Sequence, residues 1–242
     1  DFCAADMQFG PGLSVHSMMD RKFAPLTFKG WEEADLHGDQ AKTWFGAMVD
    51  HQVNMGTTLD LLWLAKTGIE AALQDTDRRY IPPMALGRQR KLAEHIGERP
   101  DWDMFPGFEP STGAKALEKH QEVTRILHES GGLVVGGTDC GGIAYPPPGF
   151  GLLREIQLLS EAIGAMAALK AVTSVAARYL RQQDNIGSVA PGRYADLLIV
   201  DGDPLRDPEE LRKLTSVYRA GTAYDPQELF AQVPNANVGH SH

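Results

Sequence analysis

Short apolar runs alternate with longer amphipathic segments along this chain, and this alternation limits the fold more than any other feature. Helical periodicity is found at residues 41–51, 114–129, 151–162 and 166–180. The apolar runs predict buried strands at residues 13–15, 133–135 and 197–200, with a further candidate at 53–59. Strands that alternate with helices are typical of α/β proteins with parallel strand pairing. The predicted fold class is therefore α/β.

The segment 131–142, Gly-Gly-Leu-Val-Val-Gly-Gly-Thr-Asp-Cys-Gly-Gly, carries the strongest chemical signal in the sequence. Its two leading glycines would end the preceding helix, and an apolar strand then ends in Thr138 and Asp139 before a glycine-rich turn. In a parallel barrel the active site lies at the carboxyl ends of the strands, so Asp139 would face the reaction site. A carboxylate there can bind a metal ion and accept a proton from water. The alternative for this motif alone is that Asp139 only stabilises the turn.

Two histidines stand where metal ligands could lie. His16 ends the apolar run 13–15, and His37 precedes a glycine in the segment 30–39. Neutral imidazole suits zinc, although a single histidine is more often a structural or surface group. Four further histidines in helical segments are expected at the surface or at helix ends and not as metal ligands: His51, His95, His120 and His128.

These patterns together resemble the imidazolonepropionase- and prolidase-like branch of the amidohydrolase superfamily. Gly-Leu-Ser-Val-His at 12–16 and Gly-Trp-Glu-Glu-Ala-Asp-Leu-His-Gly at 30–38 are similar to the segments in which that family places the histidines of strands 5 and 6. Thr138-Asp139-Cys140-Gly141 is similar to the strand 8 pattern Thr-Asp-Ser-Gly. The family's C-terminal helices and its closing run are matched by residues 152–159, 168–180 and 186–204.

The resemblance implies the C-terminal half, strands 5–8, of a TIM-like (β/α)8 barrel, followed by strands of a small β-sandwich domain. Residues 1–185 would belong to the barrel, residues 186–225 would return to the β-sandwich, and residues 226–242 would form a C-terminal tail. The family's first His-x-His and its bridging lysine would lie before His16, and the His-x-His at 240–242 looks like a tag remnant. We therefore expect the N-terminal half of the barrel, an upstream segment or a second chain, as a partner. A homo-oligomer is also expected, because open strand edges invite pairing.

The activity implied is metal-dependent hydrolysis of C–N bonds in amides, cyclic amides or dipeptides. His16, His37 and Asp139 would bind a divalent metal, with zinc expected, and Asp139 would also be the catalytic residue. One or two ions are expected, and the second set of ligands would lie outside this chain. A small-molecule substrate with an apolar or ring-bearing group would contact three aromatic residues: Trp102, Tyr145 and Phe150.

Charge and hydropathy exclude other classes of partner. The net charge of −9 argues against nucleic acids and anionic membranes, which are bound through an excess of Lys and Arg. No apolar run approaches the roughly 20 residues that span a bilayer, and a cytoplasmic location is expected. Two alternatives to an amidohydrolase remain: a non-catalytic barrel remnant that acts as a binding or assembly protein, and a phosphotriesterase or lactonase on the same scaffold. Metal content would separate the remnant from the enzymes.

Overall fold

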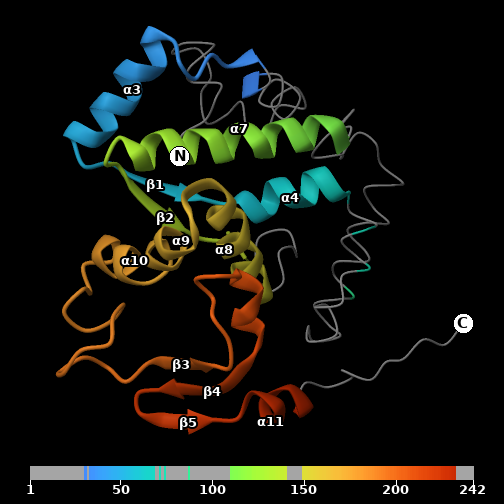
Figure 1. Ribbon diagram of the computed structural model, residues 1–242, viewed down its shortest axis with the longest axis vertical. Coiled ribbons are helices and arrows are strands. Elements are labelled where there is room, and N and C mark those ends of the chain that lie inside the picture. The colour runs from blue at the N-terminus through green and yellow to red at the C-terminus, as the bar shows by residue number, and fades with distance from the viewer. Residues whose placement is uncertain are drawn as a thin grey trace, which may run out of the picture.

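The structure, a computed structural model, describes residues 30–31, 33–68, 71, 74, 87, 110–140 and 149–232. Its helices and strands follow one another along the chain as shown in Figure 1. In order they are α3 (Asp39–Asp50), β1 (Asn54–Thr57), α4 (Leu59–Thr67), α7 (Pro110–Glu129), β2 (Leu133–Gly136), α8 (Phe150–Ile163), α9 (Ala165–Ala171), α10 (Ser174–Tyr179), β3 (Leu197–Val200), η4 (Pro208–Arg212), β4 (Leu214–Arg219), β5 (Thr222–Tyr224) and α11 (Pro226–Ala231).

Strands β1 and β2 form a parallel pair, although about 75 residues separate them in the chain. Their register runs from Asn54 opposite Leu133 to Thr57 opposite Gly136. In Figure 1 the pair lies between α7 on one side and α8, α9 and α10 on the other. The parallel pairing and the covering helices confirm the predicted α/β class. The expected strand at 13–15 lies outside the described residues.

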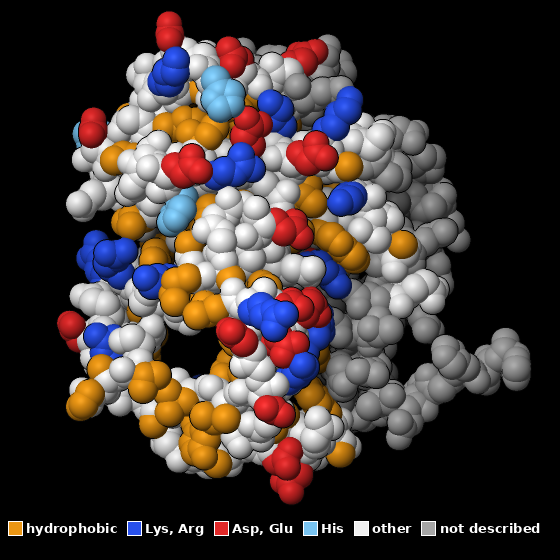
Figure 2. All heavy atoms as spheres, in the orientation of Figure 1, with side chains coloured by type: hydrophobic (Ala, Val, Ile, Leu, Met, Phe, Trp, Pro, Cys, Tyr) orange, Lys and Arg blue, Asp and Glu red, His pale blue; other side chains and the backbone are white. Residues whose placement is uncertain are grey.

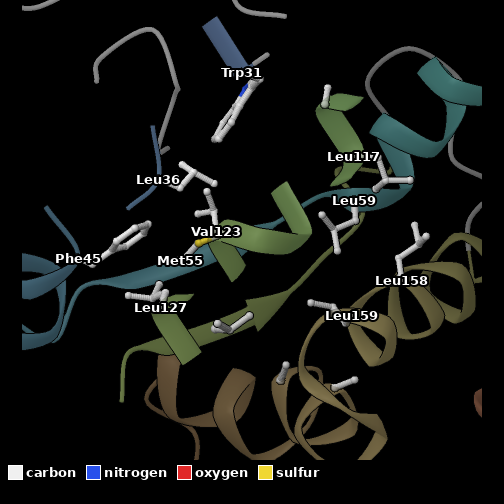
Figure 3. Close-up of a cluster of buried hydrophobic side chains, with 14 of the residues drawn as sticks. Trp31, Leu36, Phe45, Met55, Leu59, Leu117, Val123, Leu127, Leu158 and Leu159 are labelled. Carbon is white, nitrogen blue, oxygen red and sulfur yellow. The ribbon is translucent and has the colours of Figure 1, made fainter. Parts of the chain in front are cut away.

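The main hydrophobic core packs around both faces of α7. Val123 and Leu127, one turn apart on α7, are fully buried, as are Leu59 at the start of α4 and Leu159 on α8. Figure 3 shows Trp31, Leu36 and Phe45 on the opposite side of α7 from Leu158 and Leu159. Each such side chain contributes roughly 1.5–3 kcal/mol through burial of its apolar surface. This core fixes the helices against the parallel strand pair.

Two glycines end α7 as the sequence predicts. The N–H of Gly131 donates to the carbonyl of His128 at 3.0 Å, and the N–H of Gly132 donates to the carbonyl of Leu127 at 2.8 Å. Gly131 has φ +85°, the left-handed conformation that costs glycine no steric penalty. This pair of bonds is a Schellman motif, and it directs the chain straight into β2.

The predicted helix at 166–180 is two helices in the structure, α9 and α10. The break falls at Val172 and Thr173, two β-branched residues with restricted side chains. The hydroxyl of Thr173 donates to the carbonyl of Leu169 at 2.6 Å. A side-chain bond of this kind competes with the helical pattern, which hydrophobic periodicity alone does not register.

Strands β3, β4 and β5 form a separate antiparallel sheet in that order. β3 coincides with the predicted strand at 197–200 and pairs with β4 from Leu197 opposite Tyr218 to Val200 opposite Leu214. Figure 1 shows this sheet at the end of the molecule away from α3 and α7. The helix η4, between β3 and β4 in the chain, packs against α8 and connects the sheet to the helices.

The first six residues of the expected C-terminal tail at 226–242 form the helix α11. The carboxylate of Asp225 accepts the N–H of Gln227 at 2.7 Å, and Pro226 occupies the first helical position. Both features favour a helix start. Among the described residues, no helix has the length and apolar character needed to cross a membrane.

Candidate active site

The carboxyl ends of β1 and β2 lie side by side and bring the chemically interesting residues together. The N–H of Gly137 donates to the carbonyl of Thr57 at 3.2 Å, so the two chains stay paired beyond the last strand residues. Asp139 follows two residues later and is exposed. The structure thus places Asp139 beyond the carboxyl end of a buried parallel strand, as predicted from the sequence.

Asp139 has a left-handed backbone with φ +51°. Aspartate and asparagine adopt this region more readily than other residues with a side chain, although it still costs about 1–2 kcal/mol. Non-glycine residues held in such conformations concentrate at functional sites. The conformation sets the direction in which the chain, and with it the Asp139 carboxylate, leaves β2.

Behind the strand ends lies a buried carboxylate, Glu155 of α8, which has no exposed surface. Its Oε1 accepts the hydroxyl of Thr57 at 2.6 Å, and its Oε2 accepts the backbone N–H of Asp60 at 2.9 Å. Burial raises the pKa of Glu155 to about 7. Hydrogen bonds from Thr57 and from the N–H groups of Asp60 and Leu59 lower this pKa, and the Asp60 charge raises it further, but desolvation is the largest effect.

A buried ion pair stands next to Glu155. Arg154 Nη1 lies 3.6 Å from Oδ1 of Asp60, and the Asp60 side chain is fully buried. The Arg154 guanidinium also lies over the Trp63 ring, with its Cζ 3.7 Å from the ring centroid. Cation–π contact and ion pairing together hold α8 against α4. Removing one partner of a buried pair costs about 3–5 kcal/mol, because the other charge stays buried alone.

The predicted placement of His37 at the end of a strand is wrong. The residues before it at 30, 31 and 33 are helical, and His37 itself lies in a turn before α3. Its side chain is 75% exposed, and its Nε2 lies 2.9 Å from Oε1 of Glu122 on α7. The Leu-His-Gly sequence that resembles a strand 6 ligand is here the entry to α3, since Gly38 precedes the first residue of that helix.

The aromatic residues predicted to contact substrate fall in different parts of the chain. Phe150 is the first residue of α8, and its ring stacks on Phe230 of α11 with centroids 6.0 Å apart. Packing against Phe230 accounts for the partial burial of the Phe150 ring. A role of Phe150 in substrate binding stays a prediction. Three of the predicted site residues lie outside the described residues: His16, Trp102 and Tyr145.

The described residues do not form a metal site by themselves. None of them belongs to a group of three or more His, Cys, Asp and Glu side chains placed to hold an ion. Asp139 is a single carboxylate ligand, and a divalent cation needs several ligands. Cys140 beside it is a free, exposed cysteine, and desolvation raises the pKa of its thiol, which disfavours the reactive thiolate. Any metal chemistry at this edge would need donors from outside the described residues.

Glu155 and Asp60 were not predicted as functional residues, although a signal for Glu155 is present. Glu155 lies three, four and seven residues before the buried Leu158, Leu159 and Ala162, so helical periodicity puts it on the buried face of α8. A charged residue in a buried stripe requires a partner. The partners, Thr57 and the start of α4, come from a distant part of the chain, and helical periodicity cannot identify them.

The Amidohydrolase family model matches residues 47–224, well over half of the chain. The matched range includes the parallel strand pair, Asp139, Glu155 and the whole antiparallel sheet. The chain therefore belongs to the Amidohydrolase family. A search of curated proteins gave no match.

Several solved structures are similar to this chain. A Xaa-Pro dipeptidase with bound methionine in its active site is 27% identical over 56% of this chain and 33% of its own, with a TM-score of 0.43. Ochratoxinase from A. niger is 16% identical over 80% of this chain and 35% of its own, with a TM-score of 0.48. Molinate hydrolase is 19% identical over 81% and 47%, with a TM-score of 0.40. The chain spans less than half the length of each, and superpositions at these scores carry no functional argument.

Proposed function

We propose that this chain is part of an enzyme that hydrolyses carbon–nitrogen bonds in amides, cyclic amides or dipeptides, with Asp139 as its catalytic residue. The observation that carries the proposal is the position of Asp139, an exposed carboxylate in a left-handed turn after a buried parallel strand. Membership of the Amidohydrolase family supports it. Fold alone does not set the reaction, so the proposal depends on this carboxylate.

The proposed role of Asp139 is proton transfer. Its carboxylate accepts a proton from the water molecule whose oxygen attacks the substrate carbonyl carbon. The same proton then passes to the nitrogen of the breaking C–N bond, so that the acid fragment retains the water oxygen and the amine leaves neutral. General acid–base catalysis of this kind contributes typically 10²- to 10⁴-fold to the rate. Exposure of Asp139 gives substrate and water access to the carboxylate.

We further propose a divalent metal cofactor, zinc, held by Asp139, by His16 and by ligands from the N-terminal half of the barrel. When bound, such an ion supplies Lewis-acid polarisation of the scissile carbonyl. His37 is not part of this proposal, because it lies in the turn before α3 and not at the carboxyl end of a parallel strand. Elemental analysis of the purified protein tests the cofactor: His16→Ala should lower the bound zinc, whereas His37→Ala should leave it unchanged. Equal zinc content in wild type and His16→Ala would contradict the ligand assignment.

Asp139→Asn tests the catalytic role. Asparagine keeps the shape and tolerates the left-handed backbone, but it cannot accept the proton. Turnover of a panel of dipeptides, N-acyl amino acids and cyclic amides should fall by roughly 10²- to 10⁴-fold. Asp184→Asn, a change at an exposed turn residue after α10, is the matched control and should keep full turnover. Wild-type turnover in Asp139→Asn would contradict the proposal, and an inactive, metal-free wild type would favour a non-catalytic barrel remnant.

A further inference from the structure

One side chain of α8 ties together segments that are otherwise distant in the sequence. Glu155 lies 98 residues from Thr57, which ends β1, and 95 residues from Asp60, which lies in the first turn of α4. Both of its carboxylate oxygens are occupied by donors from this β1–α4 junction. The carboxylate is fully buried, so water does not compete for these bonds.

The junction held by Glu155 is itself bonded to the segment that carries Asp139. Thr57, whose hydroxyl donates to Glu155, also accepts the N–H of Gly137 through its carbonyl at 3.2 Å. Gly137 precedes Asp139 by two residues. A continuous set of hydrogen bonds therefore runs from α8 through Thr57 to the backbone just before the proposed catalytic carboxylate.

The start of α4 shows why Glu155 is needed there. The first N–H groups of a helix have no partner within the helix, and Thr58 at the N-cap makes no side-chain capping bond. Glu155 supplies the missing acceptor from a neighbouring helix, and its negative charge also suits the positive end of the helix dipole. The carboxylate thus caps α4 and fixes the end of β1 at the same time.

We propose that Glu155 is a positioning residue: by binding Thr57 and the first turn of α4, it holds the carboxyl ends of β1 and β2 in the register that places Asp139. This inference rests on the proposed function for its catalytic consequence, but not for its structural one. Glu155 touches neither substrate nor reacting atoms in this scheme. Its effect passes through Thr57 and Gly137.

The test combines kinetics with hydrogen exchange of the full protein. In Glu155→Gln, the amide oxygen can still accept the Asp60 N–H, but the amide NH₂ then faces Thr57, whose hydroxyl must accept instead of donate, so the bond that Thr57 donates to a charged carboxylate is lost. Amide exchange in the peptide covering residues 133–140 should accelerate roughly 10- to 100-fold, as expected for losing such a bond. Exchange in β3 and β4 should be unchanged. The kcat should fall while KM stays near the wild-type value, because the Asp139 geometry and not substrate binding is altered.

Matched variants separate positioning from general destabilisation. Thr57→Val removes the hydroxyl with little change of shape and should reproduce both effects of Glu155→Gln, whereas Thr57→Ser keeps the donor and should restore local exchange and kcat. Glu161→Gln, an exposed position on the same helix, should behave as wild type.

If Glu155→Gln does not fold, the two Thr57 variants decide the question. Wild-type exchange at 133–140 in Glu155→Gln or Thr57→Val would overturn the inference. If the wild type hydrolyses nothing, the proposed function fails, and local exchange still tests the positioning role.

Discussion

Strands β2 and β3 have nearly the same sequence character but differ in how far their middle residues are exposed. β2 is Leu-Val-Val-Gly and β3 is Leu-Leu-Ile-Val, each four residues long. Val134 in β2 is 4% exposed, whereas Leu198 and Ile199 in β3 are 56% and 48% exposed. Figure 2 shows hydrophobic side chains gathered on the surface at the end of the molecule that holds the β3–β5 sheet. An apolar run therefore predicts a strand, but the elements that cover it decide how much of it is buried.

The largest expected difference between the two regions is in the cost of removing a buried side chain. Leu159 is fully buried behind β2, so Leu159→Ala should lower the free energy of unfolding by about 2–5 kcal/mol. Leu198→Ala in the exposed β3 should cost less than about 1 kcal/mol, since little apolar surface is buried there. Urea unfolding of both variants measures the contrast, and equal losses would show that the β3 sheet is covered in solution.

Glu155, behind β1 and β2, should make stability depend on pH in the direction opposite to that of His120 on α7, whose pKa burial lowers to about 3. Burial, with a smaller contribution from the Asp60 charge, raises the pKa of Glu155 from 4.5 to about 7. The folded state thus binds more protons than the unfolded state between these values. Stability should be greatest below pH 4.5 with respect to this group and fall as the pH rises to about 7, by about 1.4 kcal/mol per pKa unit.

The Glu155→Gln variant isolates this contribution, because glutamine does not titrate. Its free energy of unfolding, compared with that of the wild type between pH 4.5 and 8, should lack the fall assigned to Glu155. A wild type and a variant with parallel pH profiles would show that Glu155 titrates normally in the folded protein.

A smaller difference in stability is expected between alanine substitutions at two glycines of the parallel strand pair. A methyl group on Gly136 of β2 would lie 2.7 Å from Cγ1 of Val172 and 2.8 Å from Cδ1 of Leu159, whereas one on Gly56 of β1 would meet nothing within 4 Å. Gly136→Ala should therefore cost about 1–3 kcal/mol through overpacking. Gly56→Ala should be neutral or slightly stabilising, since alanine reduces the entropy of the unfolded chain. Thermal unfolding compares the two, and a neutral Gly136→Ala would mean that α8 and the C-terminal end of α9 shift easily away from β2.

The smallest effect is expected at the start of α11, beside the antiparallel sheet. The Asp225 side chain caps this helix through the N–H of Gln227, so Asp225→Ala should cost about 1 kcal/mol. Asp225→Ser keeps a capping oxygen and should cost less. Chemical denaturation followed in the same way as for Leu159→Ala gives the comparison, and an unchanged midpoint in Asp225→Ala would mean that α11 is held by packing alone.

Short sequence patterns correctly predict those strands and helix ends that depend on residues close together in the chain. The apolar runs located β2 and β3, and Gly131 correctly marked the end of α7, because a left-handed glycine C-cap is a short-range device. The position of Asp139 followed from the same strand and turn. Interactions between distant segments were beyond such reasoning. Glu155 finds its donors 95 and 98 residues away in the chain.

Two histidines also have contacts with distant segments that the sequence does not predict. His37 was placed at a strand end because a Leu-His-Gly sequence resembles a family pattern, yet in the structure this sequence forms the entry to a helix. His120 is expected at the surface or at a helix end, but its ring centroid lies 3.8 Å from that of Trp31, and burial lowers its pKa to about 3. In both cases the contact is between α7 and the segment before α3, and the histidine's own neighbours in sequence do not reveal it.

The adjacent residues Arg154 and Glu155 of α8 both contact Asp60 of α4. Arg154 pairs with the Asp60 side chain, while Glu155 accepts the Asp60 backbone N–H. These two contacts fix the N-terminal half of α8 against the start of α4. A single residue of α4 is therefore sensitive to two neighbouring side chains of α8, and we expect a substitution at either of them to disturb Asp60.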